Sequence, residues 1–169
     1  MSEKFSPFHK ERVAYKPRLP KALQGDVIVK PVNGTTAETA EEIRELFPTT
    51  SGLPCVNLVT ANGTAPTEAK ALTVGVVLSG GPAPGGHNAI AGLFDGLKKI
   101  HPDSRLLGFL NGPIGVIEGD QVEITAELVD EYRNTGGFDM IASGRDKIES
   151  DEEVDRCIRA LSYLGCTAL

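Results

Sequence analysis

The sequence is poor in the residues that stack, cross-link and bind metals. It has no tryptophan, and aromatic residues make up 5% of it, so stacking on nucleobases or sugar rings is not a prominent theme. The three cysteines, Cys55, Cys157 and Cys166, are too few and too scattered for a disulfide framework or a metal knuckle. Free thiols are typical of a reducing compartment, so we expect a cytoplasmic location.

Long apolar runs and an excess of positive charge are also absent. No uninterrupted apolar run approaches the roughly 20 residues that a membrane span needs, and residues 1–12 lack the apolar core of a signal peptide. The 17 lysines and arginines stand against 23 aspartates and glutamates, which gives a net charge of −6. We therefore expect neither nucleic acid nor a membrane among the partners.

The chain does have enough length for one domain with a sizeable core, 169 residues in all. Residues 1–26 are rich in lysine, proline and arginine and predict an extended arm. Short strands are predicted at residues 27–29 and 56–60. The apolar spacing between these strands predicts a helix over residues 39–47, which Pro48 ends.

The turn at residues 62–66 separates a predicted N-terminal extension, residues 1–70, from an incomplete α/β domain, residues 71–169. Strand–helix–strand order at the start of this domain implies parallel pairing through a right-handed crossover. The predicted elements are a strand at 74–78, a helix at 88–100, a strand at 104–110, a tight loop at 111–115, a helix at 125–132, a strand at 140–142, a helix from 151 and the start of another strand at 167–169.

The last of these helices has the clearest local signals. Ser150 and Glu153 have the spacing of a capping box, which predicts the start of the helix. Val154, Ile158 and Leu161 recur at helical spacing, and we expect them to form its buried face.

A glycine-rich loop over residues 79–86 lies between the first strand and the first helix of the α/β domain. Its four glycines let the backbone turn sharply and approach a ligand without interference from a Cβ atom. A strand, a glycine loop and a helix N-terminus together favour phosphate, because bare N–H groups converge on the anion. The alternative is a turn needed only for close strand–helix packing, since the loop matches neither a Walker A motif nor G-x-G-x-x-G.

Two segments narrow this choice. SGGPAPGGHN, residues 79–88, resembles the phosphate-binding loop that opens the phosphofructokinase fold, and more closely its pyrophosphate-dependent branch. GGFDMIASGRDKI, residues 136–148, is similar to the second signature of that branch, and LFPTTSGLP, residues 46–54, to the N-terminal extension of its long members. The resemblance implies a parallel-sheet, three-layer, Rossmann-like α/β domain, truncated here and preceded by an N-terminal extension.

At two positions the chain has a proline where ATP-dependent members of the family usually have another residue. ATP-dependent members of the family usually carry an aspartate where this chain has Pro82. They also tend to place an aromatic side chain against adenine where this chain has Pro113. The resemblance therefore favours a phosphoryl donor without a base.

The resemblance also assigns roles within the loop. Gly80 and Gly81 are expected to contact a donor phosphate through their backbone N–H groups, and Gly85 and Gly86 to serve the geometry of the same site. His87 has no acidic or serine partner nearby in the sequence, so we expect a packing residue at the start of the helix.

Arg145 is the predicted catalytic residue. It follows directly after a predicted parallel strand, at the carboxyl edge where ligands bind in open α/β sheets. Its planar guanidinium can bridge two phosphate oxygens and offset the charge of a transferring phosphoryl group. The alternative is a surface ion pair with Asp146 or Glu149. Lys147 either adds charge to the donor phosphate site or is a solvated neighbour.

The implied activity is phosphoryl transfer from pyrophosphate to fructose 6-phosphate, with Mg²⁺, in glycolysis. In the family, the metal-binding carboxylates and the general base come from segments that have no match here, so we expect a fragment that is inactive alone and contains no metal site. The whole enzyme is expected to be a homo-oligomer, a dimer. The alternatives are an ATP-dependent 6-phosphofructokinase, or a non-catalytic regulatory subunit that keeps the phosphate-binding loop.

Overall fold

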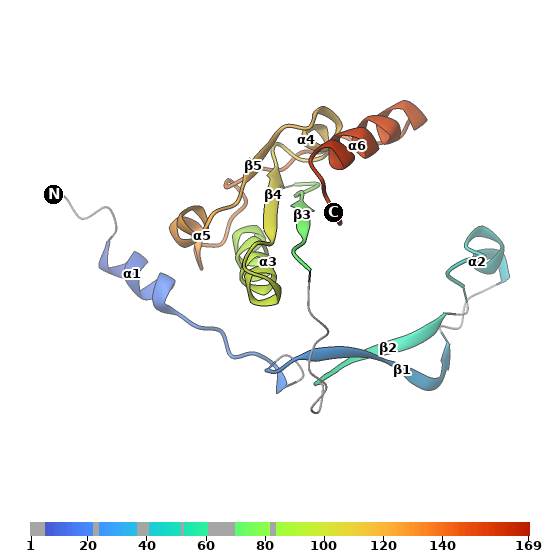
Figure 1. Cartoon of the computed structure of the whole chain (residues 1–169), viewed down its shortest axis with the longest axis horizontal. Coiled ribbons are helices and arrows are strands. Elements are labelled where there is room, and N and C mark those ends of the chain that lie inside the picture. Colours follow the sequence, from blue (N-terminus) through green and yellow to red (C-terminus); the bar gives the residue numbers. More distant parts are fainter. Residues whose placement is uncertain (1–5, 22–23, 37–40, 52, 61–69, 82–83) are drawn as a thin grey trace. The chain divides into compact units, whose positions relative to one another are not determined.

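The computed structural model describes residues 6–21, 24–36, 41–51, 53–60, 70–81 and 84–169 (Figure 1). Two compact units make up the chain, one of Met1–Tyr15 with Glu68–Leu169 and the other of Lys16–Thr67. Within the described residues, no helix is long and apolar enough to cross a membrane. The domain boundary predicted between residues 70 and 71 stays a prediction.

The unit of Lys16–Thr67 is a two-stranded antiparallel sheet. Strand β1, Val27–Thr36, pairs with β2, Pro54–Thr60, and helix α2, Glu41–Leu46, lies between them in sequence. Both predicted strands and the helix are confirmed, although β1 continues well beyond the predicted residue 29. The predicted start of the helix at residues 39 and 40 lies outside the described residues. Among the described residues of this unit, none is buried.

Helix α1, Pro7–Ala14, corrects the prediction of an extended arm. The Ser6 side chain accepts a hydrogen bond from the His9 N–H at 3.2 Å, and Pro7 stands at the first turn, where its missing N–H costs nothing. The Arg12 guanidinium donates to the carbonyl oxygen of Thr135 at 2.7 Å. Pro7 therefore begins a helix, whereas Pro17 and Pro20 lie in residues 15–20, which form neither helix nor strand.

The unit of Met1–Tyr15 with Glu68–Leu169 is built on a small mixed sheet. Strand β3, Thr73–Val76, leads through helix α3, Gly86–Ile100, to strand β4, Arg105–Phe109, and β3 and β4 pair in parallel as predicted. Strand β5, Gln121–Glu123, was not predicted, and it pairs antiparallel with β4. On the other side of β3, Ala168 forms a parallel bridge with Val74, in agreement with the predicted start of a strand at 167–169.

Helices cover both faces of this sheet. Alternate residues of β4 point to opposite faces, so they pack against different helices. Leu106 packs in one apolar cluster with α3 and with α5, Ala126–Tyr132. Phe109 packs in the other with α4, Pro113–Glu118, and α6, Asp151–Tyr163. The predicted α/β class and its three layers are confirmed.

Two local predictions in this unit are wrong. Residues 140–142 do not form a strand: residues 140 and 141 form a turn, and Ala142 after it has a left-handed φ of 56°. Met140 and Ile141 are apolar because both are buried in the core, a property that strands and buried turns share. The predicted tight loop at 111–115 contains the first turn of α4, since Pro113 stands at a helix start.

Helix α6 begins where the capping box predicted. The Ser150 side chain accepts from the Glu153 N–H at 3.2 Å, and the Glu153 carboxylate accepts from the Ser150 N–H at 3.0 Å. The predicted buried face is wrong in part, because Val154 and Ile158 are 43% and 56% exposed. Cys157 is buried in their place, next to the partly buried Leu161.

Candidate functional site

The two glycine-containing segments singled out in the sequence meet just beyond β3. Ser79 and Gly144 form a parallel bridge, and the Gly80 N–H donates to the Gly144 carbonyl at 2.7 Å. The Gly144 N–H in turn donates to the Leu78 carbonyl at 3.4 Å. The described residues of the glycine loop, 79–81 and 84–86, and residues 136–148 are therefore two walls of one site at the carboxyl end of β3, where ligands bind in open α/β sheets.

Gly80 has a backbone conformation that lets the loop turn. Its φ of 104° is strained for any other residue, and a methyl group built on it would touch nothing. Because its N–H already donates to Gly144, a phosphate contact through that group requires the bond to Gly144 to break. Gly81 is better placed, since among the described residues none accepts a hydrogen bond from its N–H.

Arg145 lies beside Gly81. A methyl group built on Gly81 would stand 3.1 Å from Nη2 of Arg145, so the guanidinium occupies the space that a side chain at Gly81 would take. Backbone that is free of a Cβ atom and a fork-shaped cation thus face the same space. This pairing can hold a phosphate between an N–H donor and a charge-assisted bidentate partner.

A pocket of about 300 Å³ opens at this place. Its size is at the lower end of the range for small-molecule sites. The lining comes from both walls, with Val77, Leu78, Ser79, Gly81 and Gly86 on one and Phe138 and Ser143 on the other.

The alternative predicted for Arg145 was a surface ion pair. Within the described part of the chain, no ion pair joins Arg145 to Asp146 or Glu149. Glu149 is engaged by Lys147 instead, with 3.2 Å between Nζ and Oε1. Both of these side chains are at least 70% exposed, so Lys147 has the surroundings of a solvated neighbour.

The start of α3 shows what Gly85 and Gly86 do in the fold. Gly85 caps the helix with a φ of 101°, and a methyl group on Gly86 would stand 2.8 Å from the Gly137 carbonyl oxygen. That oxygen also accepts from the His87 N–H at 3.1 Å. One of the free donors of the helix start is therefore used to join the two walls. Participation of Gly85 and Gly86 in binding a ligand stays a prediction.

Sequence analysis missed a second glycine contact. The backbone of Gly112, just before α4, packs directly on the backbone of Gly144, and neither position has room for a side chain. The Asn111 N–H donates to the Ile141 carbonyl at 2.9 Å in the same region. These contacts hold the segment before Arg145 against the end of β4. The only signal in the sequence is a glycine in each of two loops, which does not indicate that they touch.

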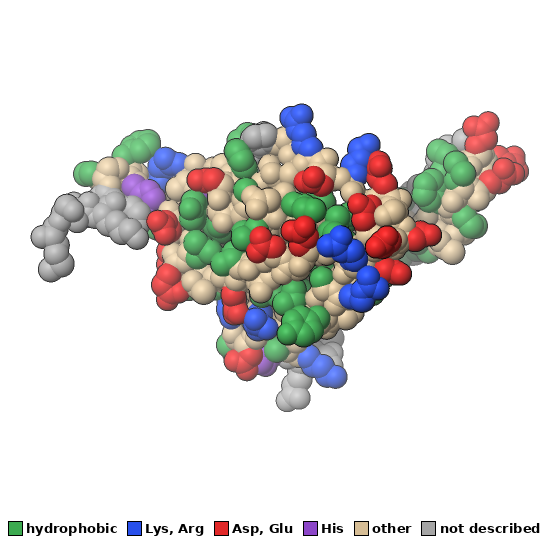
Figure 2. All heavy atoms as spheres, turned by 90° about the horizontal axis from the view of Figure 1, so that it is seen from above, with side chains coloured by type: hydrophobic (Ala, Val, Ile, Leu, Met, Phe, Trp, Pro, Cys, Tyr) green, Lys and Arg blue, Asp and Glu red, His purple; other side chains and the backbone are tan. Residues whose placement is uncertain are grey.

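No metal site accompanies the pocket in the described part of the chain, where no three His, Cys, Asp or Glu side chains are grouped to hold an ion. Acidic and basic side chains are interspersed over the face shown in Figure 2, without a continuous basic patch. Arg145 lies beside Gly81, which lines the pocket, and can supply positive charge there.

With this geometry, the site has the features of a phosphate-binding loop in an α/β protein. No family model matches the chain. Over 97% of its length the chain is 50% identical to a pyrophosphate–fructose 6-phosphate 1-phosphotransferase of Porphyromonas gingivalis. It is 43% identical over 83% of its length to the subunit beta 2 of the enzyme of that name in Arabidopsis thaliana. The predicted resemblance to the pyrophosphate-dependent enzymes is confirmed.

The match covers a part of these relatives. The chain spans 30% of the Porphyromonas gingivalis relative and 25% of the Arabidopsis thaliana subunit. A solved structure, that of Pichia pastoris phosphofructokinase in the T-state, aligns with 66% of this chain and 13% of its own, at 18% identity and a TM-score of 0.45. This structural likeness is too distant to add to the argument.

Proposed function

We propose that this chain supplies the phosphoryl-donor site of a pyrophosphate-dependent 6-phosphofructokinase. The reaction moves one phosphoryl group of pyrophosphate to the 1-hydroxyl of fructose 6-phosphate, giving fructose 1,6-bisphosphate and phosphate. The observation that carries the proposal is the approach of Arg145 to Gly81, at 3.1 Å from the position of a Cβ atom. The names of the relatives indicate which phosphate donor the site takes.

In this proposal, Gly81 donates its N–H to a phosphate oxygen, and Arg145 bridges two oxygens of the transferring group. The guanidinium then offsets charge that spreads over the equatorial oxygens in the transition state. The walls of the pocket position the donor before the transfer, which lowers the entropic part of the activation barrier. Gly80 contributes its N–H only after the bond to Gly144 is exchanged.

The general base and the ligands of Mg²⁺ are expected from the part of the relatives that this chain does not span. The described residues do not fit a Mg²⁺ site, because no group of carboxylates surrounds the pocket. No step is therefore assigned to a metal within this chain. We further expect the whole enzyme to work in cytoplasmic glycolysis, as an oligomer.

Two experiments test the proposal. In the first, pyrophosphate, phosphate and ATP are titrated calorimetrically into the purified chain, with and without Mg²⁺. We expect pyrophosphate to bind more tightly than ATP, because Pro113 stands where ATP-dependent members of the family tend to place an aromatic side chain against adenine. Tighter binding of ATP would favour the ATP-dependent alternative, and no binding of any of the three would contradict the proposal.

In the second experiment, residues 1–169 replace the matching part of the Porphyromonas gingivalis enzyme. Fructose 1,6-bisphosphate formed by this chimera is measured through aldolase, with the unaltered enzyme as the positive control. We expect turnover from the chimera with pyrophosphate, and none from the isolated chain above a boiled control. A chain that binds pyrophosphate but gives a folded, inactive chimera would favour the non-catalytic alternative.

A further inference from the structure

His87 is a buried, titratable side chain that the proposed mechanism does not use. It is the second residue of α3 and is 2% exposed. Its ring meets the ring of Tyr132 edge-on, with 4.6 Å between centroids. The pocket beside Gly81 does not include it among its lining residues. A histidine in this position acts on the site through its neighbours.

Both ring nitrogens have partners on the segment after α5. Nδ1 lies 3.0 Å from Oγ1 of Thr135, and this hydroxyl donates to the Tyr132 carbonyl at 2.6 Å. Oγ1 is therefore free to accept from Nδ1–H. On the other side of the ring, the Met140 N–H donates to Nε2 at 3.2 Å. The neutral ring with its proton on Nδ1 satisfies both bonds.

Asp139 offers a further contact, 2.8 Å from its Oδ1 to Nε2. One nitrogen cannot accept from the Met140 N–H and donate to a carboxylate at the same time, so this contact requires a proton on Nε2. The Asp139 side chain is 73% exposed and can turn to water when Nε2 accepts from the Met140 N–H. In either form, His87 is bonded to residues 135–140.

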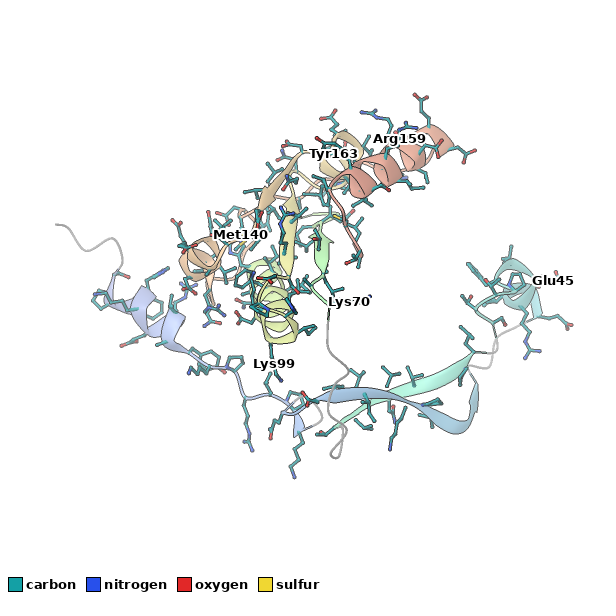
Figure 3. The ribbon with its side chains drawn as sticks, viewed as in Figure 1. Glu45, Lys70, Lys99, Met140, Arg159 and Tyr163 are labelled. Atoms are coloured by element: carbon teal, nitrogen blue, oxygen red, sulfur yellow. The ribbon has the colours of Figure 1, made fainter. Side chains whose placement is uncertain are left out.

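This segment leads directly to the wall that carries Arg145. Met140 packs in the core with α3 and α5, which Figure 3 shows in side-chain detail. Phe138 and Ser143 line the pocket opposite Gly81 and Gly86. Since His87 stands on the helix that the glycine loop begins, its side chain ties the two walls of the pocket together.

We propose that His87 is a positioning residue that sets the spacing between the glycine loop and the segment carrying Arg145. It does not touch the donor. It holds the second wall so that Gly81 and Arg145 bind the same phosphate group. This inference rests on the proposed function, since the spacing matters for pyrophosphate.

Substitutions can separate the two bonds. An asparagine amide at position 87 reaches the place of Nδ1, and a glutamine amide reaches the place of Nε2. His87→Asn therefore keeps a donor for Thr135, and His87→Gln keeps an acceptor for the Met140 N–H. Met140 lies between Phe138 and Ser143 in the sequence, whereas Thr135 precedes both. We therefore expect His87→Gln, which keeps the bond to Met140, to preserve the pocket better than His87→Asn.

A matched control is available on the same helix. His101 stands just after the last residue of α3, at the end away from the pocket, and its Nδ1 accepts from the Asp103 N–H at 3.1 Å. His101→Ala removes an imidazole and a backbone hydrogen bond, as His87→Ala does, without changing the walls of the pocket.

The first measurement is calorimetric titration of pyrophosphate into the full chain and its variants, at a temperature where each is folded by circular dichroism. We expect the Kd to rise at least 10-fold in His87→Ala and in His87→Asn, less than 3-fold in His87→Gln, and less than 2-fold in His101→Ala. A purely structural role would lower the melting temperature and leave the Kd of the folded variants unchanged, and that result would overturn the inference. If His87→Ala does not fold, the inference is tested by the Kd of His87→Asn against that of His87→Gln, and equal values would overturn it.

The second measurement does not depend on pyrophosphate. The N–H groups of Gly80 and Asn111 donate to the carbonyls of Gly144 and Ile141, on the wall that His87 is proposed to hold. We expect these two amides to exchange hydrogen at least 10-fold faster in His87→Ala than in the wild type or in His101→Ala. Unchanged exchange would overturn the inference. Failure of the wild type to bind pyrophosphate would contradict the proposed function alone, since the exchange result still stands.

Discussion

The two units of this chain use their apolar residues in opposite ways. In the unit that carries the glycine loop, Ile90, Leu107 and Phe109 are fully buried. In the two-stranded sheet, Val29 and Leu58 stand directly opposite each other on β1 and β2, yet are 60% and 54% exposed. One unit has an interior that supports a binding site, and the other presents an apolar face.

This difference predicts where stability resides. Each fully buried leucine or phenylalanine is worth roughly 1.5–3 kcal/mol relative to an exposed one. A two-stranded sheet without a covered face is only marginally stable in water, because the entropic cost of ordering its backbone exceeds the stabilisation from its few contacts. We therefore expect the cooperative unfolding of the chain to report on the unit that carries the glycine loop.

The largest expected effect comes from one substitution made in both units. Leu107→Ala removes a side chain that is 0% exposed and leaves a cavity, so the free energy of unfolding should fall by about 2–5 kcal/mol. Leu58→Ala, on the exposed face of β2, should change it by no more than about 0.5 kcal/mol. Urea titration followed by circular dichroism measures both. Equal losses would show that the face of the two-stranded sheet is covered in solution.

A smaller effect is expected at the edge of the larger unit, where α6 depends on its own cap. Ser150→Ala removes the acceptor for the Glu153 N–H and should cost about 1 kcal/mol of unfolding free energy. Ser162→Ala, an exposed serine on the same helix, is the matched control. Thermal melting should separate the two variants by several degrees, and equal melting temperatures would show that packing alone holds α6.

The pKa of Glu153 gives this prediction a pH dependence. Hydrogen bonds from the backbone of Ser150 and Glu149 lower the pKa below its ordinary value of 4.5. A carboxyl group with a lowered pKa in the folded state stabilises the protein fully above pH 4.5. That contribution is lost as the pH falls from 4.5 through the lowered pKa. Glu153→Gln should therefore reduce the acid sensitivity of α6, measured by melting between pH 3 and 6.

The smallest effect is expected for the ion pair between β4 and β5. Arg105 Nη2 lies 2.8 Å from Glu123 Oε2, and the hydrogen bond from Arg105 lowers the pKa of Glu123. Both side chains are about half exposed, 46% and 50%, so Glu123→Gln should cost at most about 1 kcal/mol at neutral pH. The cost should fall with added salt, and also as the pH drops below 4.5. Urea titrations at low and high salt measure it, and a loss independent of salt would contradict the ion-pair account.

Features that depend on residues close together in the sequence were predictable. The capping box at Ser150, the helix predicted at residues 125–132 and the parallel strands around the glycine loop all follow from short local patterns. Helix α1 was missed because the whole of residues 1–26 was interpreted as extended from its proline content, although Pro7 stands where a helix accepts proline.

Contacts between distant residues were beyond prediction. The sequence places Gly81 and Arg145 in one site only through their resemblance to a family, and it does not indicate that they touch. Likewise, Met140 has the apolar character of a strand residue, but its N–H donates to His87 in a buried turn. Burial and backbone pairing depend on the whole fold, so local periodicity cannot distinguish these cases.

The kcat of Arg145→Ala in the Porphyromonas gingivalis chimera, with pyrophosphate varied at saturating fructose 6-phosphate, tests whether Arg145 and the glycine loop bind the phosphoryl donor together. We expect kcat to fall by roughly 10²-fold or more, because a preorganised charge is removed from the transition state. Arg145→Lys should restore part of it, since a point charge lacks the fork. Arg159→Ala, on α6 (Figure 3), is the control and should leave turnover intact. An unchanged kcat in Arg145→Ala would show that Arg145 does not stabilise the transferring phosphoryl group.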